Sequence, residues 1–362
     1  MPKIPVLNAI QMIGFHQWLR VGVLAVLMLL AGLEPRRDWG VSVAMAQTAD
    51  GAVLTTGYKQ IHHYGVDIDI WYPSQGPITR SRHGPFPVEY ATNGAPIGER
   101  LPVVVLSHGL DGWPRNHHLT ARALVADGHV VVAPKHAHDT LVRFGRPVLA
   151  LEKRIQDLAA ALAAVNLDVV LRPHLDPSQV KGVGYSLGSA SILIAAGARI
   201  DREQLLNHCA QWQAEDQAFC GQIDQAWWKR VVNWLRGADK GQDSFALAAP
   251  IIAGDISLVA PIGQGMDLSR INQGKAKVQI LSLGHDTQLP PQFHAKVLLS
   301  RLGVEKINYQ NYPGVHHYAF IAPFPDEITA EEDIPVAKDP AGFDRAIFLK
   351  RINRDIMLFL RE

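Results

Sequence analysis

Hydrophobic positions along the chain fall into short apolar runs separated by stretches with helical spacing. The apolar runs fit buried strands and cover residues 101–107, 129–134, 180–185, 256–261, 277–284 and 306–313. The helical stretches cover residues 115–127, 151–165, 189–198, 291–302 and 344–360. An earlier segment, 66–73, alternates apolar and polar positions and indicates a half-buried strand. Strands that alternate with helices predict an α/β fold with a mostly parallel sheet covered on both faces.

One segment, residues 201–245, interrupts this alternation. It contains both cysteines of the chain and four tryptophans, Trp212, Trp227, Trp228 and Trp234. Residues 225–235 have the spacing of a helix with one apolar face. We expect an inserted helical lid over the carboxyl edge of the sheet. Its tryptophans either pack the lid onto the body, line an apolar pocket or contact lipid.

The N-terminal segment differs in kind from the rest. Residues 21–33 contain no polar side chain, Lys3 and Arg20 precede them, and Ala44-Met45-Ala46 supplies a small-x-small cleavage signal. This order predicts a secretory signal over residues 1–46, with residues 47–362 as the exported periplasmic or secreted domain. The alternative is an uncleaved anchor, although the 13-residue apolar run is shorter than the ~20 residues that span a bilayer.

Charge and cysteine content narrow the class of protein. With 35 basic and 34 acidic residues, the chain lacks the excess positive charge typical of nucleic-acid binding. Two cysteines are too few for a disulfide framework or a four-cysteine zinc site. In an oxidising compartment Cys209 and Cys220 can pair. In one continuous helix they would lie ~16 Å apart, so pairing requires the chain to turn between them.

A G-x-S-x-G motif gives the first chemical signal. Gly184 and Gly188 flank Ser186, with an apolar strand before the motif and a helix of small residues after it. This context is typical of a nucleophile elbow, in which a strained turn exposes the serine hydroxyl above the sheet edge. An ordinary strand-to-helix turn is the alternative interpretation.

A nucleophilic serine needs a base and an acid that orients it. The loop after the last predicted strand offers His317, and the loop after the preceding strand offers Asp286. The chain order Ser186, Asp286, His317 is that of α/β-hydrolases. The alternatives are His316 as the base and Asp255 or Asp267 as the acid.

An oxyanion needs two backbone N–H donors. The residue after the nucleophile, Leu187, is one candidate, and Leu110 in the loop after strand 101–107 is the other. We interpret His108 as structural support of that loop. The pairs His117-His118 and His136/His138 have no recognised metal-ligand spacing, so we expect neither a metal nor a cofactor.

Several of these segments together resemble a known family. LSHGLDG, LVADGHVVVAPKHAHDT, GYSLGSA, SLGHDTQLPP and PGVHHYAF are similar to the α/β-hydrolase family, and within it to bacterial predicted dienelactone hydrolases related to platelet-activating-factor acetylhydrolases. The resemblance implies Ser186 as nucleophile, Asp286 as acid, His317 rather than His316 as base, and Leu110 as an oxyanion donor. Dienelactone hydrolase proper has a cysteine nucleophile, so the serine here favours ester hydrolysis.

These observations predict an exported serine esterase that works through an acyl-enzyme on small-molecule or lipid-like esters. The alternatives are an amidase or peptidase with the same triad, and a non-catalytic binding protein that keeps the fold. Peripheral lipid contact through the lid is a further expectation.

Overall fold

The computed structural model describes residues 54–143, 146–223, 244–331 and 335–361. All of them belong to one compact unit, Met45–Glu362. The predicted signal segment, 1–46, lies outside the described residues, as do Trp227, Trp228, Trp234 and the helix predicted over 225–235. Among the described helices, none has both the length and the hydropathy needed to cross a membrane.

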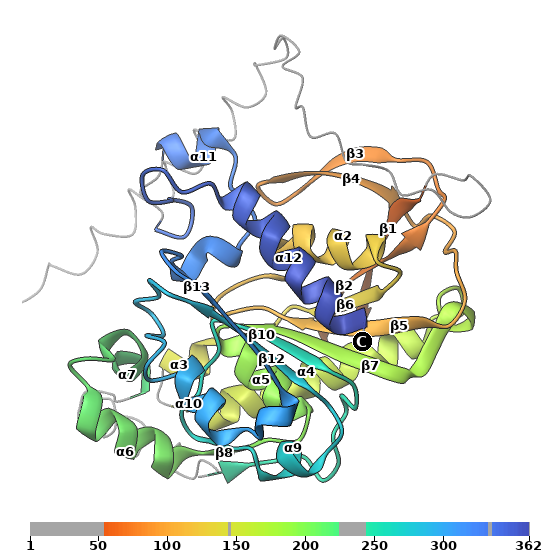
Figure 1. Cartoon of the computed structure of the whole chain (residues 1–362). Coiled ribbons are helices and arrows are strands. Elements are labelled where there is room, and N and C mark those ends of the chain that lie inside the picture. Colours follow the sequence, from red (N-terminus) through yellow and green to blue (C-terminus); the bar gives the residue numbers. More distant parts are fainter. Residues whose placement is uncertain (1–53, 144–145, 224–243, 332–334, 362) are drawn as a thin grey trace, which may run out of the picture. The chain divides into compact units, whose positions relative to one another are not determined.

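Within the described part of the chain, ten strands form the main sheet (Figure 1). They are β1 (Thr55–His63), β2 (Val66–Ser74), β3 (Thr79–His83), β4 (Phe86–Thr92), β5 (Leu101–Ser107), β6 (Val130–Pro134), β7 (Leu175–Tyr185), β10 (Ile256–Val259), β12 (Val278–Leu283) and β13 (Ile307–Tyr312). Three short strands form a second sheet: β8 (Arg199–Asp201), β9 (Ser244–Phe245) and β11 (Met266–Asp267).

The strand order of the main sheet is β13-β12-β10-β7-β5-β6-β2-β1-β4-β3. The six strands from β13 to β6 are parallel, whereas β2 runs antiparallel to β6 and β1 antiparallel to β2. The chain crosses from β6 over β5 to β7 and then steps outward to β13, with helices in the crossovers. This is the α/β-hydrolase fold, and it confirms the predicted fold class.

Helices cover both faces of the sheet. The α-helices are α2 (His118–Ala126), α3 (Thr140–Arg143), α4 (Pro147–Leu167), α5 (Leu187–Ala195), α6 (Arg202–Trp212), α7 (Gln217–Ile223), α9 (Ser269–Gln273), α10 (Ala295–Arg301), α11 (Asp326–Glu331) and α12 (Arg345–Arg361). Short 3₁₀ helices are η1 (Pro114–His117), η2 (Arg172–His174), η3 (Val304–Lys306) and η4 (His317–Phe320). Figure 1 shows α2 and α12 on one face, and α4, α5 and α10 on the other.

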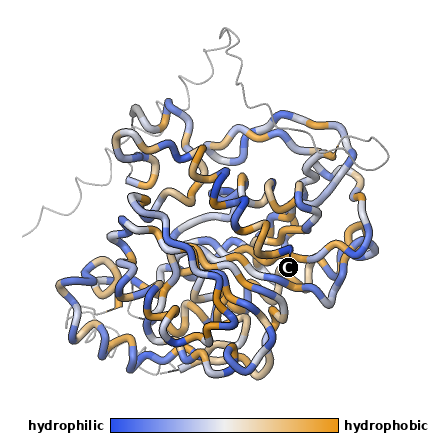
Figure 2. Tube along the Cα trace, in the orientation of Figure 1, coloured by the Kyte–Doolittle hydropathy of each residue, from blue (hydrophilic) through white to orange (hydrophobic). Residues whose placement is uncertain are grey.

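The central strands are apolar because both of their faces are buried. Along β5, Val103 and Val105 point into the core under α4 and α5, and Val104 and Leu106 point into the core under α2 and α12. Figure 2 shows this concentration of apolar residues along the central strands. Successive side chains of a strand alternate between faces, so a continuous apolar run serves both cores.

Several element boundaries differ from the sequence prediction. The helix predicted over 115–127 is the 3₁₀ helix η1 followed by α2, and the helix predicted over 291–302 begins only at Ala295. Strands β1, β3 and β4 were not predicted. They form an extension of mixed polarity at the β3 end of the sheet, in which β4 runs parallel to β1 and β3 antiparallel to β4. β3 is exposed along most of its length. Such strands carry little hydrophobic periodicity.

Candidate active site

The turn between β7 and α5 holds Ser186 in an unusual backbone conformation. Its φ is 53° and its ψ is −122°. Non-glycine residues pay ~1–3 kcal/mol for such a conformation, so the surroundings must enforce it. The Ser186 N–H donates to the Val259 carbonyl at 3.0 Å, and the Ser186 carbonyl accepts from the Ser189 hydroxyl at 2.6 Å. These bonds fix the turn with the Ser186 side chain at the carboxyl edge of the sheet.

The two motif glycines allow α5 to start this close to the strands. A Cβ on Gly188 would lie 2.0 Å from the Ser107 carbonyl oxygen, at the end of β5. A Cβ on Gly184 would lie 2.6 Å from the Gly188 carbonyl oxygen. Both contacts are with backbone, which cannot rotate away. The G-x-S-x-G pattern therefore reflects steric crowding at this turn.

His317 lies between Ser186 and Asp286. Its Nε2 is 3.1 Å from Ser186 Oγ, and its Nδ1 is 2.6 Å from Asp286 Oδ2. Since a carboxylate oxygen accepts, Nδ1 carries the proton and Nε2 is left to accept from the serine hydroxyl. The Tyr185 hydroxyl donates to the His317 carbonyl at 2.9 Å and fixes the backbone of the histidine.

Asp286 is held by its own loop. Its Oδ1 accepts the N–H groups of Gln288 at 2.9 Å and Leu289 at 2.8 Å, which leaves Oδ2 for His317. The side chain is almost fully buried. The His285 N–H donates to the Val315 carbonyl at 2.9 Å and ties this loop to the one that carries His317. The chain thus sets the spacing of acid and base by backbone bonds.

The alternative base points elsewhere. His316 Nε2 is 3.0 Å from Asp339 Oδ1, and Arg345 Nε donates to the same oxygen at 2.8 Å. The bonds from His316 and Arg345 lower the pKa of Asp339 despite its partial burial, so this carboxylate stays charged and retains both partners. His316 is thereby directed away from Ser186.

The alternative acids are occupied by local backbone groups. Asp255 Oδ1 accepts the Lys277 N–H at 2.7 Å, and Asp255 precedes β10, at the sheet edge opposite the serine. Asp267 Oδ1 accepts the Ser269 N–H at 2.9 Å. Bonds from Ser269 lower the pKa of Asp267. The structure therefore brings Ser186, His317 and Asp286 together, and neither alternative acid.

The two residues proposed as oxyanion donors flank the serine. Leu187 is the first residue of α5, and Leu110 follows Gly109 in the loop after β5. A Cβ on Gly109 would lie 3.3 Å from Ser186 Cβ, so this loop passes directly beside the nucleophile. Both leucines line the cavity above Ser186. Their role as donors to an oxyanion stays a prediction.

A cavity of about 250 Å³ opens over Ser186 and His317. Its apolar wall is formed by side chains from several elements: Val142, Leu151, Leu187, Ala190, Ile200, Leu205, Phe219, Ile223, Ile262, Met266, Leu289 and Ile321. Polar residues also line it: Asp111, Asn116, Arg143, Gln222 and Gln288. An apolar cavity with a few polar groups beside a nucleophile is suited to a small organic substrate.

One wall of the cavity comes from the inserted segment. We call α6 and α7 the cap segment (residues 202–223). It contributes Leu205, Phe219 and Ile223 to the cavity lining. Trp212, the one described tryptophan of the insert, is 36% exposed and packs against Phe293 with ring centroids 5.3 Å apart. It contacts the body rather than the cavity.

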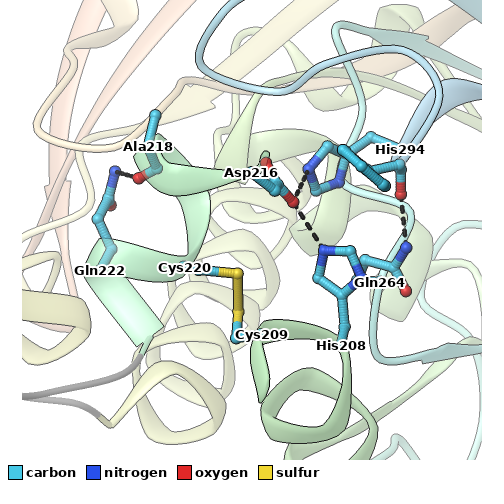
Figure 3. Close-up of a disulfide and its surroundings, with 9 residues drawn as sticks. His208, Cys209, Asp216, Ala218, Cys220, Gln222, Gln264 and His294 are labelled. Carbon is cyan, nitrogen blue, oxygen red and sulfur yellow. Dashed lines mark hydrogen bonds and ion pairs between the residues drawn. A yellow bond between two sulfur atoms is a disulfide. The ribbon is translucent and has the colours of Figure 1, made fainter. Parts of the chain in front are cut away.

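Two contacts stabilise the cap segment, one within it and one to the body (Figure 3). A disulfide joins Cys209 of α6 to Cys220 of α7, with Cα atoms 5.3 Å apart, which agrees with the predicted pairing and turn. Asp216 Oδ2 lies between His208 Nε2 at 2.8 Å and His294 Nε2 at 3.0 Å, so it links the cap segment to the body. The disulfide fixes α6 against α7, and the Asp216–His294 contact fixes the cap segment against the body.

The other buried histidines have structural surroundings. Burial lowers the pKa of His117 to about 3 and that of His118 to about 4, so both are neutral near pH 7. His108 Nδ1 donates to the Gly109 carbonyl at 2.7 Å, in agreement with its interpretation as loop support. His136 uses both ring nitrogens, toward Ser107 at 3.0 Å and Asp157 at 2.9 Å.

Among the described residues, one cluster has side chains that metals prefer, namely His208, Asp216 and Cys220. Cys220 is oxidised to the disulfide and has no thiolate to offer. The Gly263 N–H donates to His294 Nδ1 at 3.3 Å, so His294 Nε2 carries its proton and donates to Asp216. In this structure Asp216 therefore links His208 and His294 through hydrogen bonds.

A buried arginine of α4, which the sequence pattern did not single out, also touches the site. Arg154 is fully buried and donates to the carbonyl oxygens of His108 and Gly109, the two residues before Leu110. Its spacing with Leu151 and Leu158 places it on the buried face of the helix, which is the signal that could have identified it.

Solved structures of other proteins resemble this chain, whereas the sequence comparisons find no match. No family model matches the chain, and no curated protein is similar enough to match. A solved structure described as a PEG-bound complex of a novel cold-adapted esterase from an Arctic intertidal metagenomic library is 15% identical. The match covers 72% of this chain and 84% of the esterase chain, with a TM-score of 0.41.

Proposed function

We propose that this protein is a serine hydrolase that cleaves carboxylic esters. The observation that carries the proposal is the continuous chain of contacts from Ser186 Oγ through His317 to Asp286, at 3.1 Å and 2.6 Å. A hydroxyl becomes nucleophilic only when a base takes its proton, and here the base and its orienting acid are both in place. The strained backbone at Ser186 supports the same role.

The reaction proceeds in two steps. His317 Nε2 accepts the proton of Ser186 as Oγ attacks the ester carbonyl, and Asp286 stabilises the imidazolium through Nδ1. The tetrahedral oxyanion accepts from the N–H groups of Leu110 and Leu187. His317 then gives the proton to the leaving alcohol. In the second step His317 deprotonates water as it attacks the acyl carbonyl, and then returns that proton to Ser186 Oγ as the acid is released.

The cavity supports a substrate with a small or medium apolar group. Its volume of about 250 Å³ is below the ~300–1,000 Å³ typical of pockets for drug-sized ligands, and its wall is mainly aliphatic. The assignment to the group of predicted dienelactone hydrolases and platelet-activating-factor acetylhydrolases belongs to this proposal. It rests on the sequence segments that resemble that group.

Export from the cytoplasm is part of the proposal. It is supported by the signal-like N-terminal sequence and by the disulfide of the cap segment, since disulfides persist mainly in oxidising compartments.

A chain-length series tests the function. p-Nitrophenyl acetate, butyrate, octanoate and palmitate are compared by kcat/KM, with p-nitroanilides of the same acids in parallel. We expect hydrolysis of the shorter esters, a fall for palmitate and little anilide cleavage. Faster anilide than ester hydrolysis would instead indicate an amidase. Hydrolysis of neither series would indicate a non-catalytic binding protein.

A further inference from the structure

The loop that carries Leu110 is held by a buried ion pair from a different part of the chain. Arg154 Nη1 donates to the His108 carbonyl at 2.7 Å, and Arg154 Nη2 donates to the Gly109 carbonyl at 3.0 Å. The same guanidinium binds both oxygens of Asp139, at 2.7 Å and 2.6 Å. One planar fork therefore satisfies four acceptors, an arrangement that a lysine ammonium cannot reproduce.

Asp139 completes the support from the other side of Leu110. Its Oδ2 accepts the Asp111 N–H at 2.9 Å. The Gly112 N–H also donates to the Gly109 carbonyl at 3.1 Å, which closes a tight turn in which Asp111 has a φ of 52°. The backbone groups on both sides of Leu110 are thus occupied by buried partners.

Peptide planarity turns these contacts into a statement about Leu110. The Gly109 carbonyl and the Leu110 N–H belong to one trans peptide group, so they point in opposite directions. Arg154 and His108 Nδ1 fix the carbonyl oxygen toward the interior under the loop. The N–H is then directed away from Arg154, on the side where Leu110 lines the cavity over Ser186. A cation on the carbonyl also polarises the peptide and strengthens its N–H as a donor.

We propose that Arg154, paired with Asp139, is a positioning residue that aims and polarises the Leu110 N–H for the oxyanion. Arg154 touches neither substrate nor the triad; it acts through the loop after β5, where it binds the carbonyl oxygens of His108 and Gly109. The inference rests on the proposed ester hydrolysis and identifies the residue that orients one of its two oxyanion donors.

Arg154→Lys keeps the positive charge and removes the fork. We expect kcat for p-nitrophenyl butyrate to fall by at least about 10-fold, toward the ~100-fold or greater loss that follows removal of one oxyanion donor, with KM within about threefold of wild type. Affinity for a trifluoromethyl ketone, which forms a tetrahedral adduct with the serine, should fall in parallel with kcat/KM. The pH profile of kcat/KM should keep its midpoint, because His317 and Asp286 are untouched.

Arg115→Lys is the matched control, because Arg115 forms a comparable pair with buried Asp69 at 3.0 Å. It should leave kcat within about twofold of wild type. Asp139→Asn is a second test. It preserves side-chain size but replaces the carboxylate that binds Arg154 and the Asp111 N–H by a neutral amide. It should also lower kcat while KM changes little. Activity is expressed per folded molecule, with the folded fraction measured by near-ultraviolet circular dichroism.

Wild-type kcat and ketone affinity in folded Arg154→Lys and Asp139→Asn would overturn the inference while the proposed function stands. Equal losses in Arg115→Lys would overturn it as well, since the effect would then reflect general destabilisation. A wild-type protein without esterase activity would overturn the proposed function and this inference together.

Discussion

Substitution of Gly188 tests how closely the turn at Ser186 packs against the end of β5 and the loop that carries Leu110. Any Cβ added there would meet the Ser107 carbonyl oxygen at 2.0 Å and the His108 carbonyl oxygen at 2.7 Å. Real Cβ contacts essentially never fall below 3.0 Å, so Gly188→Ala must move α5 and the end of β5 apart by about 1 Å. Ser186 and Leu187 lie on one side of that gap and Leu110 on the other.

The displacement should affect both rate and stability. A 1 Å misplacement of catalytic groups costs about 100-fold in rate, and overpacking of a well-packed site costs ~1–3 kcal/mol of stability. We expect kcat/KM for p-nitrophenyl butyrate to fall by about that factor and the urea midpoint to decrease. Stopped assays of the purified variant and urea denaturation followed by tryptophan fluorescence measure the two effects.

Gly274→Ala is the matched control for this substitution. Gly274 is exposed at the end of α9, and an added Cβ there would meet only ordinary contacts at 3.4 Å and 3.5 Å. Its activity should be unchanged and its stability within about ±0.5 kcal/mol of wild type. If Gly188→Ala keeps wild-type kcat/KM and the wild-type urea midpoint, the inferred crowding between the two loops is wrong.

Three further predictions concern the acid, the cap segment and a buried carboxyl. Asp286→Asn should lower kcat by up to ~10⁴-fold with KM little changed, because an amide favours the wrong tautomer of the histidine; a steady-state kinetic comparison that shows less than a tenfold loss would contradict this. Replacing Cys209 and Cys220 by serine removes the disulfide and should lower the free energy of unfolding by ~3 kcal/mol. The ratio of butyrate to palmitate hydrolysis should also fall, because the part of the cavity wall that the cap segment forms is then less rigid. An unchanged ratio would show that the disulfide does not shape the cavity. Burial raises the pKa of Asp157 to about 7, so between about pH 4 and pH 7 the folded state binds a proton that the unfolded state releases. This contribution to stability is fully present below about pH 4 and is lost as the pH rises through 7. Between pH 5 and pH 8 the urea midpoint of wild type should therefore fall more than that of Asp157→Asn. Equal decreases of the two midpoints would contradict the raised pKa.

Much of the fold could be predicted because the parallel strands are buried on both faces. Strands such as β5 and β6 leave a continuous apolar run in the sequence, and the helices between them have clear spacing. β3 has the sequence TRSRH and is exposed along most of its length, so its pairing with β4 depends on backbone bonds that no hydrophobic pattern records. The sequence pattern does not predict this extension of the sheet for that reason.

The candidate site was predictable where steric or topological rules apply. Gly184 and Gly188 mark the crowded turn around Ser186, and the order of the last two strands indicates the loops of the acid and base. Those rules leave the choice between adjacent histidines open. In the structure it depends on Asp339, which binds His316 and lies 23 residues farther along the chain.

Arg154 was missed for a related reason. In sequence it belongs to a charged stretch of a helix, where solvent exposure is the ordinary expectation. Its burial depends on Asp139 and on two carbonyl oxygens that β5 brings to the same point. Its spacing with Leu151 and Leu158 places Arg154 on the apolar face of the helix, but that spacing does not reveal which groups it binds.

The central claim is that Ser186 is the nucleophile and His317 its base. The most direct measurement is the rate of labelling by a fluorophosphonate, with the modified residue located by peptide mass spectrometry. We predict one adduct, on Ser186, formed by wild type and by His316→Ala at similar rates and almost abolished in His317→Ala. Labelling at another residue, or loss of labelling in His316→Ala with retention in His317→Ala, would contradict the account.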